Sequence, residues 1–549
     1  MQLFEIGYQD GWKNFVRYFD TDLDKSCAKE IDNRTEYFEP DPHGAYQHLI
    51  TGERCTKFLG KAKDAQEKPG VTRPIYRYIR DNVWEKNKFN LNPRIWYLDI
   101  ETRSGTCSKG FPEPKDALEP ISLIQFFDSK LEVMFILGYR NWEQRPGYEL
   151  DYKVKYFKFE DELSLLEGFR KIFAKLDPLI VYAWNGMGFD YPYLVNRAKR
   201  LGIEDLFANY GRTTVEVKKD ERGRDTHKVD SPGHVFFDMI DTYKRLVLAP
   251  RASYSLDSIA HVELGDNKIQ HDEYIDFDSF YTGKNYQIRD EPYDDEVREL
   301  IRQKQILRRD LDPSSDEYKA NELELEKLIA WQFVYYGIYD VYLLKKLDDK
   351  IKMSTLYLSM AALMGCQITD IQGTIKKWAV YISNVAYKDH KIAPKAITHD
   401  QPNIVGGFVR DPIKGKHEWI LNADVNSMYP MLSMAGFNMS PETILRPQDV
   451  PADLREIILK YFPDQNEDNR FNIPKEVWAK TTALLKKYNL SLGINGAVFD
   501  RSRIGIIPSL VKKIYFDRKA SKKKMLKYEQ QAEKIKAILN SRKCELHLS

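Results

Sequence analysis

Cysteine is scarce in this sequence, with five residues, at positions 27, 55, 107, 366 and 544, spread over 549. None belongs to a Cys-x-x-Cys pair, and five are too few to cross-link a chain of this length. The sequence therefore predicts a reducing compartment, without a disulfide framework and without a structural zinc site.

Long hydrophobic runs are also missing, because no stretch reaches the roughly 18 apolar residues that cross a bilayer. The first residues, MQLFEIGYQDGWKNF, lack the basic and apolar regions of a signal peptide. We therefore expect a cytoplasmic protein with no membrane partner.

An excess of one charge is absent as well, since 84 Lys and Arg residues against 82 Asp and Glu residues give a formal net charge of +2. Net charge alone thus gives no argument for a nucleic-acid partner, and any such argument has to be local. A hydrophobic content of 42% with 13% aromatic residues is typical of globular proteins. The length exceeds what one hydrophobic core organises, so several domains are expected.

Changes of pattern along the chain predict a multidomain α/β protein. Residues 1–93 mix short strands with turns and indicate a small β-rich or α/β unit. From Arg94 to about residue 352, the apolar strands RIWYLDI, ISLIQFF, EVMFILGY, LIVYAW and VFFDMID alternate with helical stretches such as ELSLLEGFRKIFAKL. The charged stretch 290–333 predicts two solvated helices broken at Pro313. After helical residues 353–395, a strand ending in ILNADVNSMYP is expected, and the last 45 residues predict a helical hairpin arm.

Acidic residues recur at the ends of the predicted strands. In WYLDIETRS, Asp99 and Glu101 stand at i and i+2 of a strand, so both carboxylates project from one face and require a cation. Asp190 follows the strand LIVYAW at a strand-to-helix junction, where it reaches a neighbouring strand end or serves as a helix N-cap. Asp340 lies among apolar neighbours, one helical turn after Tyr336, and needs a counter-charge if buried.

Four carboxylates around two divalent ions about 3.5–4 Å apart form the arrangement that cleaves phosphodiesters. Oxygen ligands of this kind favour Mg²⁺ or Mn²⁺. The sequence therefore predicts two such ions at Asp99, Glu101, Asp190 and Asp340.

The order Asp99-Ile-Glu101, Asn185-x-x-x-Phe189-Asp190 and Tyr336-x-x-x-Asp340 resembles the three exonuclease motifs of DEDDy proofreading domains, which have a ribonuclease-H-like fold. The resemblance implies a 3′→5′ exonuclease in which the four acids hold two metals and the Tyr336 hydroxyl orients the attacking water. It also implies that Asn185 and Phe189 contact DNA. The segments ASYSLDSIAHVEL and TTVEVKKDERGRDTHKV resemble segments at the same place in family B DNA polymerases of large tailed phages.

The segment from Asn422 to Pro430, NADVNSMYP, resembles the first polymerase motif of that family. The resemblance implies that Asp424 and Val425 bind the two metals of a polymerase site. Backbone N–H groups of Ser427, Met428 and Tyr429 would hold the triphosphate of a dNTP, with the Tyr429 ring beneath the sugar. Taken alone, Asp-x-x-Ser-x-Tyr-Pro indicates a strand followed by a turn rather than a polymerase site, and the exonuclease motifs upstream reverse this preference.

Two further elements resemble the family on either side of this motif. Gly406 and Gly407 match a Tyr-x-Gly-Gly element thought to bind the template and partition the primer, although Ile404 replaces the tyrosine. The stretch VKKIYFDRKASKKKMLK holds eight basic residues and one acid, with Arg518 and Lys522 at i and i+4. The resemblance assigns these two residues to the incoming nucleotide, whereas the stretch alone also fits a solvated basic helix.

The resemblance implies five parts. These are residues 1–93 and 353–395 as two segments of an N-terminal domain, 94–352 as the ribonuclease-H-like exonuclease domain, 396–503 as the first part of the palm, and 504–549 as partial fingers.

Two polymerase motifs of the family, Lys-x-x-x-Asn-Ser-x-Tyr-Gly and Tyr-Gly-Asp-Thr-Asp, do not follow Lys522. Because a lone Asp424 leaves two ions largely uncoordinated, we expect the N-terminal subunit of a split phage polymerase, in the host cytoplasm. A separate C-terminal chain would complete it and connect it to a sliding clamp. Primer–template DNA, single-stranded DNA and dNTPs are the other expected partners. Alternatives are a stand-alone 3′→5′ exonuclease, a non-catalytic DNA-binding or scaffolding protein, and a reading frame interrupted by an intron or intein.

Overall fold

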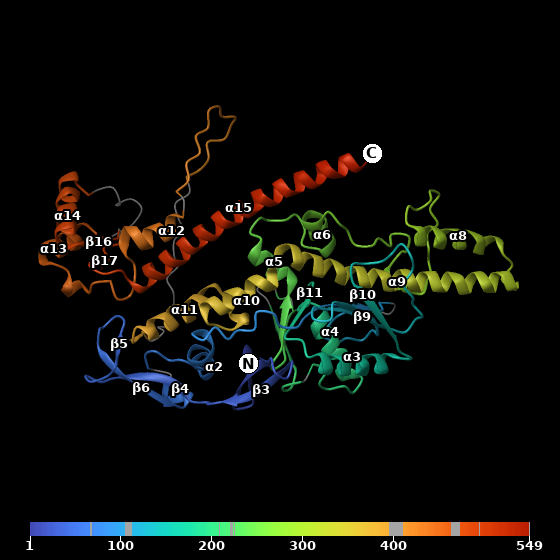
Figure 1. The fold of residues 1–549 in the computed structure, drawn as a ribbon, viewed down its shortest axis with the longest axis horizontal. Helices are drawn as coiled ribbons and strands as arrows, with labels where there is room; N and C mark the ends of the chain where they lie inside the picture. The colour runs from blue at the N-terminus through green and yellow to red at the C-terminus, as the bar shows by residue number, and fades with distance from the viewer. Residues whose placement is uncertain are drawn as a thin grey trace. The chain divides into compact units, whose positions relative to one another are not determined.

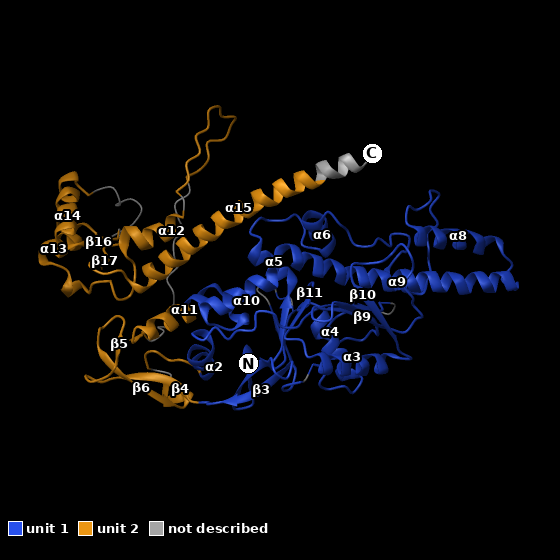
Figure 2. Ribbon diagram, viewed as in Figure 1, with its two compact units in different colours: residues 1–33, 74–378 blue, residues 34–73, 379–549 orange. Residues whose placement is uncertain are grey.

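The computed structural model describes the chain except residues 66–67, 105–111, 208, 220–222, 224, 395–409, 426, 463–472, 494 and 548–549. Contacts divide the chain into two compact units, which are residues 1–33 with 74–378 (unit 1) and residues 34–73 with 379–549 (unit 2) (Figure 2). These boundaries differ from the five expected parts, and that five-part division stays a prediction.

A six-stranded sheet forms the centre of unit 1, in the order β10-β9-β8-β7-β11-β14. Within it, β8 runs antiparallel to both neighbours, while the other five strands share one direction. The five strands predicted from apolar runs are confirmed. The bounds are β7 Ile95–Thr102, β8 Ile121–Asp128, β9 Val133–Gly138, β10 Lys153–Lys158, β11 Ile180–Ala183 and β14 Val235–Asp238.

Alternation along β7 assigns its side chains to two faces. Trp96, Leu98 and Ile100 point into an apolar core that includes Phe169 and Phe173 of α3 (Glu162–Leu176). The same core receives Tyr191, Tyr193 and Leu194 from α4 (Asp190–Arg200). Because side chains alternate along a strand, Tyr97, Asp99 and Glu101 face the opposite side.

Helix α9 (Asp316–Ile351) covers that opposite face, where the Tyr97 hydroxyl donates a 2.5 Å hydrogen bond to Asp348. The predicted break at Pro313 is confirmed, because α8 (Glu296–Asp310) ends before it and α9 begins after it. The second helix, however, runs 36 residues without interruption (Figure 1). The charged turns at its N-terminal end and Asp340 therefore belong to one helix. Unit 1 also contains β12 Thr214–Lys219, β13 Asp225–Asp230, α2 Pro74–Ile79, η1 Arg80–Trp84, α5 Met239–Leu246, α6 Leu256–Leu264, α7 Phe277–Thr282, α10 Met353–Met364 and η2 Ile368–Gln372; α11 Thr374–Lys388 begins in it.

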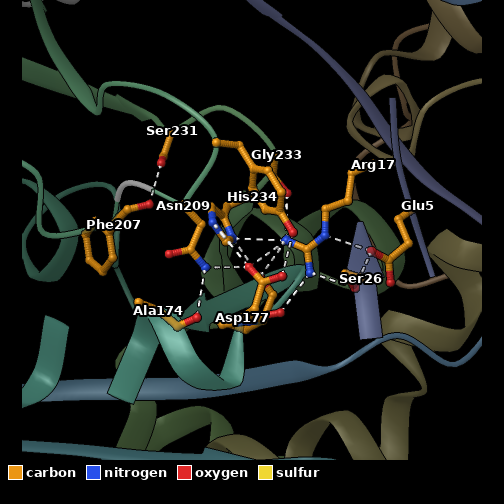
Figure 3. A network of polar contacts seen from close by, with 12 residues as sticks. Glu5, Arg17, Ser26, Ala174, Asp177, Phe207, Asn209, Ser231, Gly233 and His234 are labelled. Carbon is orange, nitrogen blue, oxygen red and sulfur yellow. Dashed lines mark hydrogen bonds and ion pairs between the residues drawn. The ribbon is translucent and has the colours of Figure 1, made fainter. Parts of the chain in front are cut away.

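A small N-terminal sheet of β1 (Gln2–Asp10), β2 (Lys13–Asp20) and β3 (Lys25–Ile31) contacts the loops before β11 and β14 through a buried arginine, among other contacts. Arg17 has a 1% exposed side chain, and its Nε donates to Glu5 at 2.7 Å. Figure 3 shows its guanidinium among the loops before β11 and β14, where it donates to the carbonyls of Asp177 (2.7 Å) and Gly233 (2.9 Å). A buried charge is tolerated only when it is paired and hydrogen-bonded in this way.

Unit 2 contains a four-stranded sheet in the order β15-β5-β6-β4 and a helical part. Its last helix, α15 (Ile506–His547), is a single 42-residue helix, so the predicted hairpin arm is wrong. Beyond Pro508 the stretch has neither Gly nor Pro to reverse the chain. The other bounds are β4 Thr35–Pro40, β5 Tyr46–His48, β6 Arg54–Gly60, α1 Ala62–Ala65, β15 Lys391–Ile392, α12 Met428–Met431, η3 Leu432–Phe437, η4 Pro447–Asp449, α13 Ala452–Tyr461, α14 Lys475–Tyr488, β16 Leu490–Leu492 and β17 Val498–Asp500. Among the described helices of either unit, none is both long and apolar enough to cross a bilayer.

His234 lies fully buried beside Arg17, with Nδ1 2.7 Å from the Pro178 carbonyl, and burial followed by the Arg17 charge lowers its pKa to about 3. Between pH 6.5 and 3 the unfolded chain therefore binds a proton that the folded chain does not, so the free energy of unfolding falls as the pH is lowered, by at most about 1.4 kcal/mol per pH unit. We expect the free energy of unfolding of His234→Gln, measured by urea denaturation between pH 7 and 5, to fall less steeply with decreasing pH than that of the parent. The same substitution at the exposed His43 should leave the parent's pH dependence intact; equal slopes for all three proteins would contradict the assignment.

Candidate active site

Three of the predicted acids meet on the face of the sheet that α9 covers. One carboxylate oxygen each from Asp99, Glu101 and Asp340 lie within 4.8 Å of one another. Glu101 is 8% exposed and Asp340 is 3% exposed, whereas Asp99 is half-buried. Strand alternation positions the first two, and α9, packed on β7 and β8, brings the third from about 240 residues further along the chain.

Asp190, which is 2% exposed, is the fourth predicted acid and begins α4, just after β11. Burial, and then the charge of Asp99, raise its pKa well above the ordinary range. Since β11 is the neighbour of β7 in the sheet, the start of α4 lies beside the end of β7. The Asp190 carboxylate interacts directly with that of Asp99, so all four predicted carboxylates lie close together at the same end of the sheet.

The electrostatics of this cluster favour a cation. Burial raises the pKa of Asp99 and of Glu101, and it raises the pKa of Asp340 to about 7. The Asp99 carboxylate adds to the upward shift at Glu101 and at Asp340. Several buried like charges cannot all stay ionised unless positive charge enters the cluster.

Unused ligand atoms point to the same chemistry. Asp190 Oδ1 and Asp340 Oδ1 are buried and accept no hydrogen bond from the residues that the structure describes. Buried carboxylate oxygens without a partner are costly, and hard divalent cations are bound by such oxygens. The residues present therefore fit a divalent metal site.

Lys268 is a member of the site that sequence reasoning missed. Its Nζ lies 2.6 Å from Asp340 Oδ2 and 4.8 Å from the centroid of the Tyr336 ring. Burial alone would lower the pKa of Lys268, but Asp340, Tyr336 and Asp99 together outweigh burial and the pKa is raised. The lysine follows the cap of α6 in an irregular segment, without any periodic signal that would have marked it.

Gln125 was missed as well. Strand register places it directly opposite Asp99 on β8, and its Nε2 donates to Asp99 Oδ2 at 2.8 Å and to Glu101 Oε1 at 3.4 Å. A lone glutamine in an apolar strand gives no sign of this role until the register of the strands is known.

Tyr336 is held rigidly one helical turn before Asp340. Its ring packs against His271 (5.3 Å between centroids), Phe277 (5.9 Å) and Phe280 (5.8 Å). Burial and then the Asp340 charge raise the pKa of its hydroxyl, so Tyr336 stays neutral and remains a hydrogen-bond donor.

The turn that carries Asn185 and Phe189 leads directly into Asp190. Asn185 adopts a positive φ of 63°, and a Cβ at Gly188 would lie only 2.4 Å from Asn185 Oδ1, so a larger residue at 188 would displace the Asn185 amide. The Phe189 ring packs on Tyr193 at 5.1 Å. The expected contact of these two residues with DNA stays a prediction.

The polymerase-motif residues all lie in unit 2. Asp424 is exposed, Val425 is 66% exposed, and Tyr429 is 78% exposed at the start of α12, which packs against α15. The strand expected before Asp424 is not formed, since residues 410–425 have no strand neighbour within the described part of the chain. Ser427 and Met428 open α12, Arg518 and Lys522 are exposed on α15, and Gly406 and Gly407 lie outside the described residues.

Two family models match this chain, and both describe the same family. Residues 64–259 match "DNA polymerase family B, exonuclease domain", and residues 372–549 match "DNA polymerase family B". Together they cover more than half of the chain. The chain belongs to DNA polymerase family B. The first match contains Asp99, Glu101 and Asp190, and the second contains Asp424, whereas Asp340 lies between the matches and is placed by the geometry of α9.

Relatives of this family B chain include DNA-directed DNA polymerases of two phages. The chain is 24% identical to that of Escherichia phage RB69 over 97% of its own length and 55% of the relative, and 25% identical to that of Enterobacteria phage T4 over 98% and 56%. A DNA polymerase of Pyrococcus glycovorans is 25% identical over 69% of the chain and 40% of the relative. The chain thus spans about half the length of the phage relatives.

Removing one charge from the acid cluster should have opposite effects with and without metal. We expect Asp190→Asn to raise the melting temperature in EDTA, because it relieves desolvation and repulsion by Asp99. The same variant should lose the stabilisation that Mn²⁺ gives the parent, which is about 2.7 kcal/mol at a metal concentration of 100 Kd. Thermal unfolding with and without Mn²⁺ measures both effects, with Asp290→Asn at an exposed position as a control that should change neither. Full Mn²⁺ stabilisation of Asp190→Asn would exclude this residue from the metal site.

Proposed function

We propose that the acid cluster of unit 1 is a two-metal 3′→5′ exonuclease site that removes nucleotides from DNA ends within a family B polymerase. The observation that carries the proposal is the meeting of Asp99, Glu101 and Asp340 within 4.8 Å, with Asp190 at the neighbouring strand end. The sheet order, with β8 alone reversed and helices on both faces, supports a ribonuclease-H-like fold.

Each side chain has a defined task in this proposal. Asp99, Glu101, Asp190 and Asp340 would hold Mg²⁺ or Mn²⁺, and two bound ions supply an activated water and stabilise the leaving oxygen. The Tyr336 hydroxyl, fixed by its aromatic neighbours, donates a hydrogen bond that orients the water. Gln125 holds the Asp99 and Glu101 carboxylates in position, and Lys268 keeps positive charge beside Asp340.

A stand-alone exonuclease is the second candidate, but the match of residues 372–549 to the polymerase family favours a polymerase. In that reading Asp424 and Val425 bind metal, while Ser427, Met428, Tyr429, Arg518 and Lys522 bind a dNTP at primer–template DNA. The exposure of Arg518 and Lys522 on α15 supports contact with a nucleotide. Gly406 and Gly407 as template contacts, a separate C-terminal chain, a sliding clamp and the host cytoplasm stay predictions.

Alanine at both Asp99 and Glu101 should abolish the nuclease. We expect degradation of a 5′-labelled single-stranded oligonucleotide with Mg²⁺ to slow by at least about 10³-fold, or about 4 kcal/mol in the barrier, because the metal ligands are lost. Tyr336→Phe should slow it by about 10- to 100-fold, since only the orienting hydroxyl is removed. The pair Asp20→Ala with Asp22→Ala removes two acids of the same spacing from the end of β2 and the turn that follows it, and should have no effect on cleavage. Unchanged cleavage by the first double variant would refute the proposal.

Synthesis by these 549 residues should be limited by metal coordination at Asp424. One exposed carboxylate leaves most coordination positions of two ions unfilled, so we expect primer extension no faster than that of Asp424→Asn. Gel analysis of a primer–template with dNTPs, in the Asp99→Ala, Glu101→Ala background to remove degradation, measures this directly. Extension that depends on Asp424 would mean that the polymerase site is already complete.

A further inference from the structure

Two arginines follow the strand ends beside the candidate exonuclease site. Strand register aligns Glu101 with Leu123 and Leu123 with Gly138, so the three form one row across β7, β8 and β9. Arg103 and Arg140 each come two residues after this row. Strands β7 and β9 flank β8 and run parallel to each other, so both end on the same side of the sheet. The two arginines that follow these ends are therefore about 9–10 Å apart at the backbone, or twice the spacing of neighbouring strands.

The ring of Tyr281, on α7, contacts both arginines. The guanidinium carbon of Arg103 lies 4.5 Å from the ring centroid, and that of Arg140 lies 4.1 Å from it. Tyr281 packs edge-on against the buried Phe333 of α9, with 5.0 Å between centroids. Because Phe333 precedes Tyr336 by about one turn of the same helix, this stack adjoins the candidate catalytic tyrosine.

The two arginines differ in their charge balance. Arg103 Nε donates to Asp278 Oδ1 at 2.5 Å, and its Nη2 donates to Oδ2 at 3.3 Å, so this charge is compensated. For Arg140, the described residues provide no carboxylate within ion-pair distance and no acceptor for its guanidinium. Its backbone carbonyl accepts a 2.5 Å hydrogen bond from the Tyr156 hydroxyl, which fixes the start of the side chain.

Stacking on a ring orients a guanidinium without using its N–H groups. All five donors of Arg140 remain available in a fixed plane, at an edge of the sheet that also presents Glu101. A planar fork of this kind pairs with two oxygens of one phosphate, which a lysine does not do.

We propose that Arg140 binds a backbone phosphate of the single-stranded DNA that enters the exonuclease site, with Tyr281 orienting the guanidinium. Arg103, held by Asp278, also stacks on the ring. The inference rests on the proposed exonuclease function and adds a strand contact outside the metal site. A released mononucleotide or free phosphate presents the same chemistry, so the tests below separate strand binding from product binding.

A phosphate contact away from the reacting bond stabilises the bound substrate and the transition state equally. Loss of the contact should then raise KM and leave kcat unchanged. For Arg140→Ala in the full chain we expect KM for a single-stranded oligonucleotide to rise about 5- to 10-fold, with kcat within about 2-fold of the parent. The slope of log kcat/KM against log salt should become shallower by about 0.7, the value for one phosphate on a single strand.

Matched variants test the physical reason. Arg170→Ala removes the same charge from the exposed face of α3 and should leave KM and the salt slope unchanged. Arg140→Lys keeps the charge but not the planar fork, so it should restore only part of the affinity. A fall in kcat for Arg140→Ala at constant KM, or equal losses for Arg140→Ala and Arg170→Ala, would overturn the proposal.

Oligonucleotides with one methylphosphonate at successive positions locate the contact. One position should raise KM for the parent and have no further effect on Arg140→Ala; identical profiles for both proteins would overturn strand binding. Product binding instead predicts a flat profile and inhibition by inorganic phosphate that is weaker in the variant, which also overturns the proposal. If the parent has no metal-dependent nuclease activity, the proposed function fails, whereas fluorescence anisotropy of the same oligonucleotides in EDTA still decides whether Arg140 binds the strand.

Discussion

Three carboxylates crowd the face of the sheet beneath α9, and Asp190 at the start of α4 interacts with that of Asp99. The repulsion among these four acids has to be balanced for the chain to fold as it does. The apolar core on the other face of β7 holds the strand in place, so Asp99 and Glu101 cannot move apart. Asp340 is equally fixed, because α9 packs against β7 and β8 along its inner half. Rigid packing on both faces thus keeps the carboxylates close together. Their mutual repulsion falls only when positive charge enters the cluster.

Two side chains moderate this repulsion without removing it. Gln125 donates to both β7 carboxylates, and Lys268 contributes one positive charge at Asp340, while oxygens of Asp190 and Asp340 remain without a partner. One lysine against four acids leaves the cluster short of positive charge. Such a site is preorganised for ions, because its ligands already lie in position before an ion binds. The free energy needed to hold the like charges together is offset by the packing of the core.

The acids were predictable from the sequence because each stands at a recognisable place in a local pattern. Asp99 and Glu101 end an apolar strand, Asp190 begins a helix, and Asp340 interrupts an apolar helical face. Helix α3 occupies the predicted stretch ELSLLEGFRKIFAKL, since its periodicity and its Asp161 cap are local as well. Gln125 and Lys268 depend on strand register and on a loop that closes over α9, which local patterns do not encode. The arm at 506–547 and the strand before Asp424 were predicted wrongly, because a turn and a neighbouring strand were assumed where the described residues supply neither.

Helix α9 serves as a single rod of 36 residues, about 54 Å long, whose outer end is paired with α8 and whose inner end bears Tyr336 and Asp340. A residue inserted in the outer turns would alter only how that end meets α8. One inserted between Tyr336 and Asp340 would rotate the acid by about 100° away from its fellow ligands. Insertions and deletions are therefore tolerated unequally along one uninterrupted helix. The half that packs on α8 is free to change in length during evolution, whereas the half with Tyr336 and Asp340 has to keep the rotation of these side chains about the helix axis.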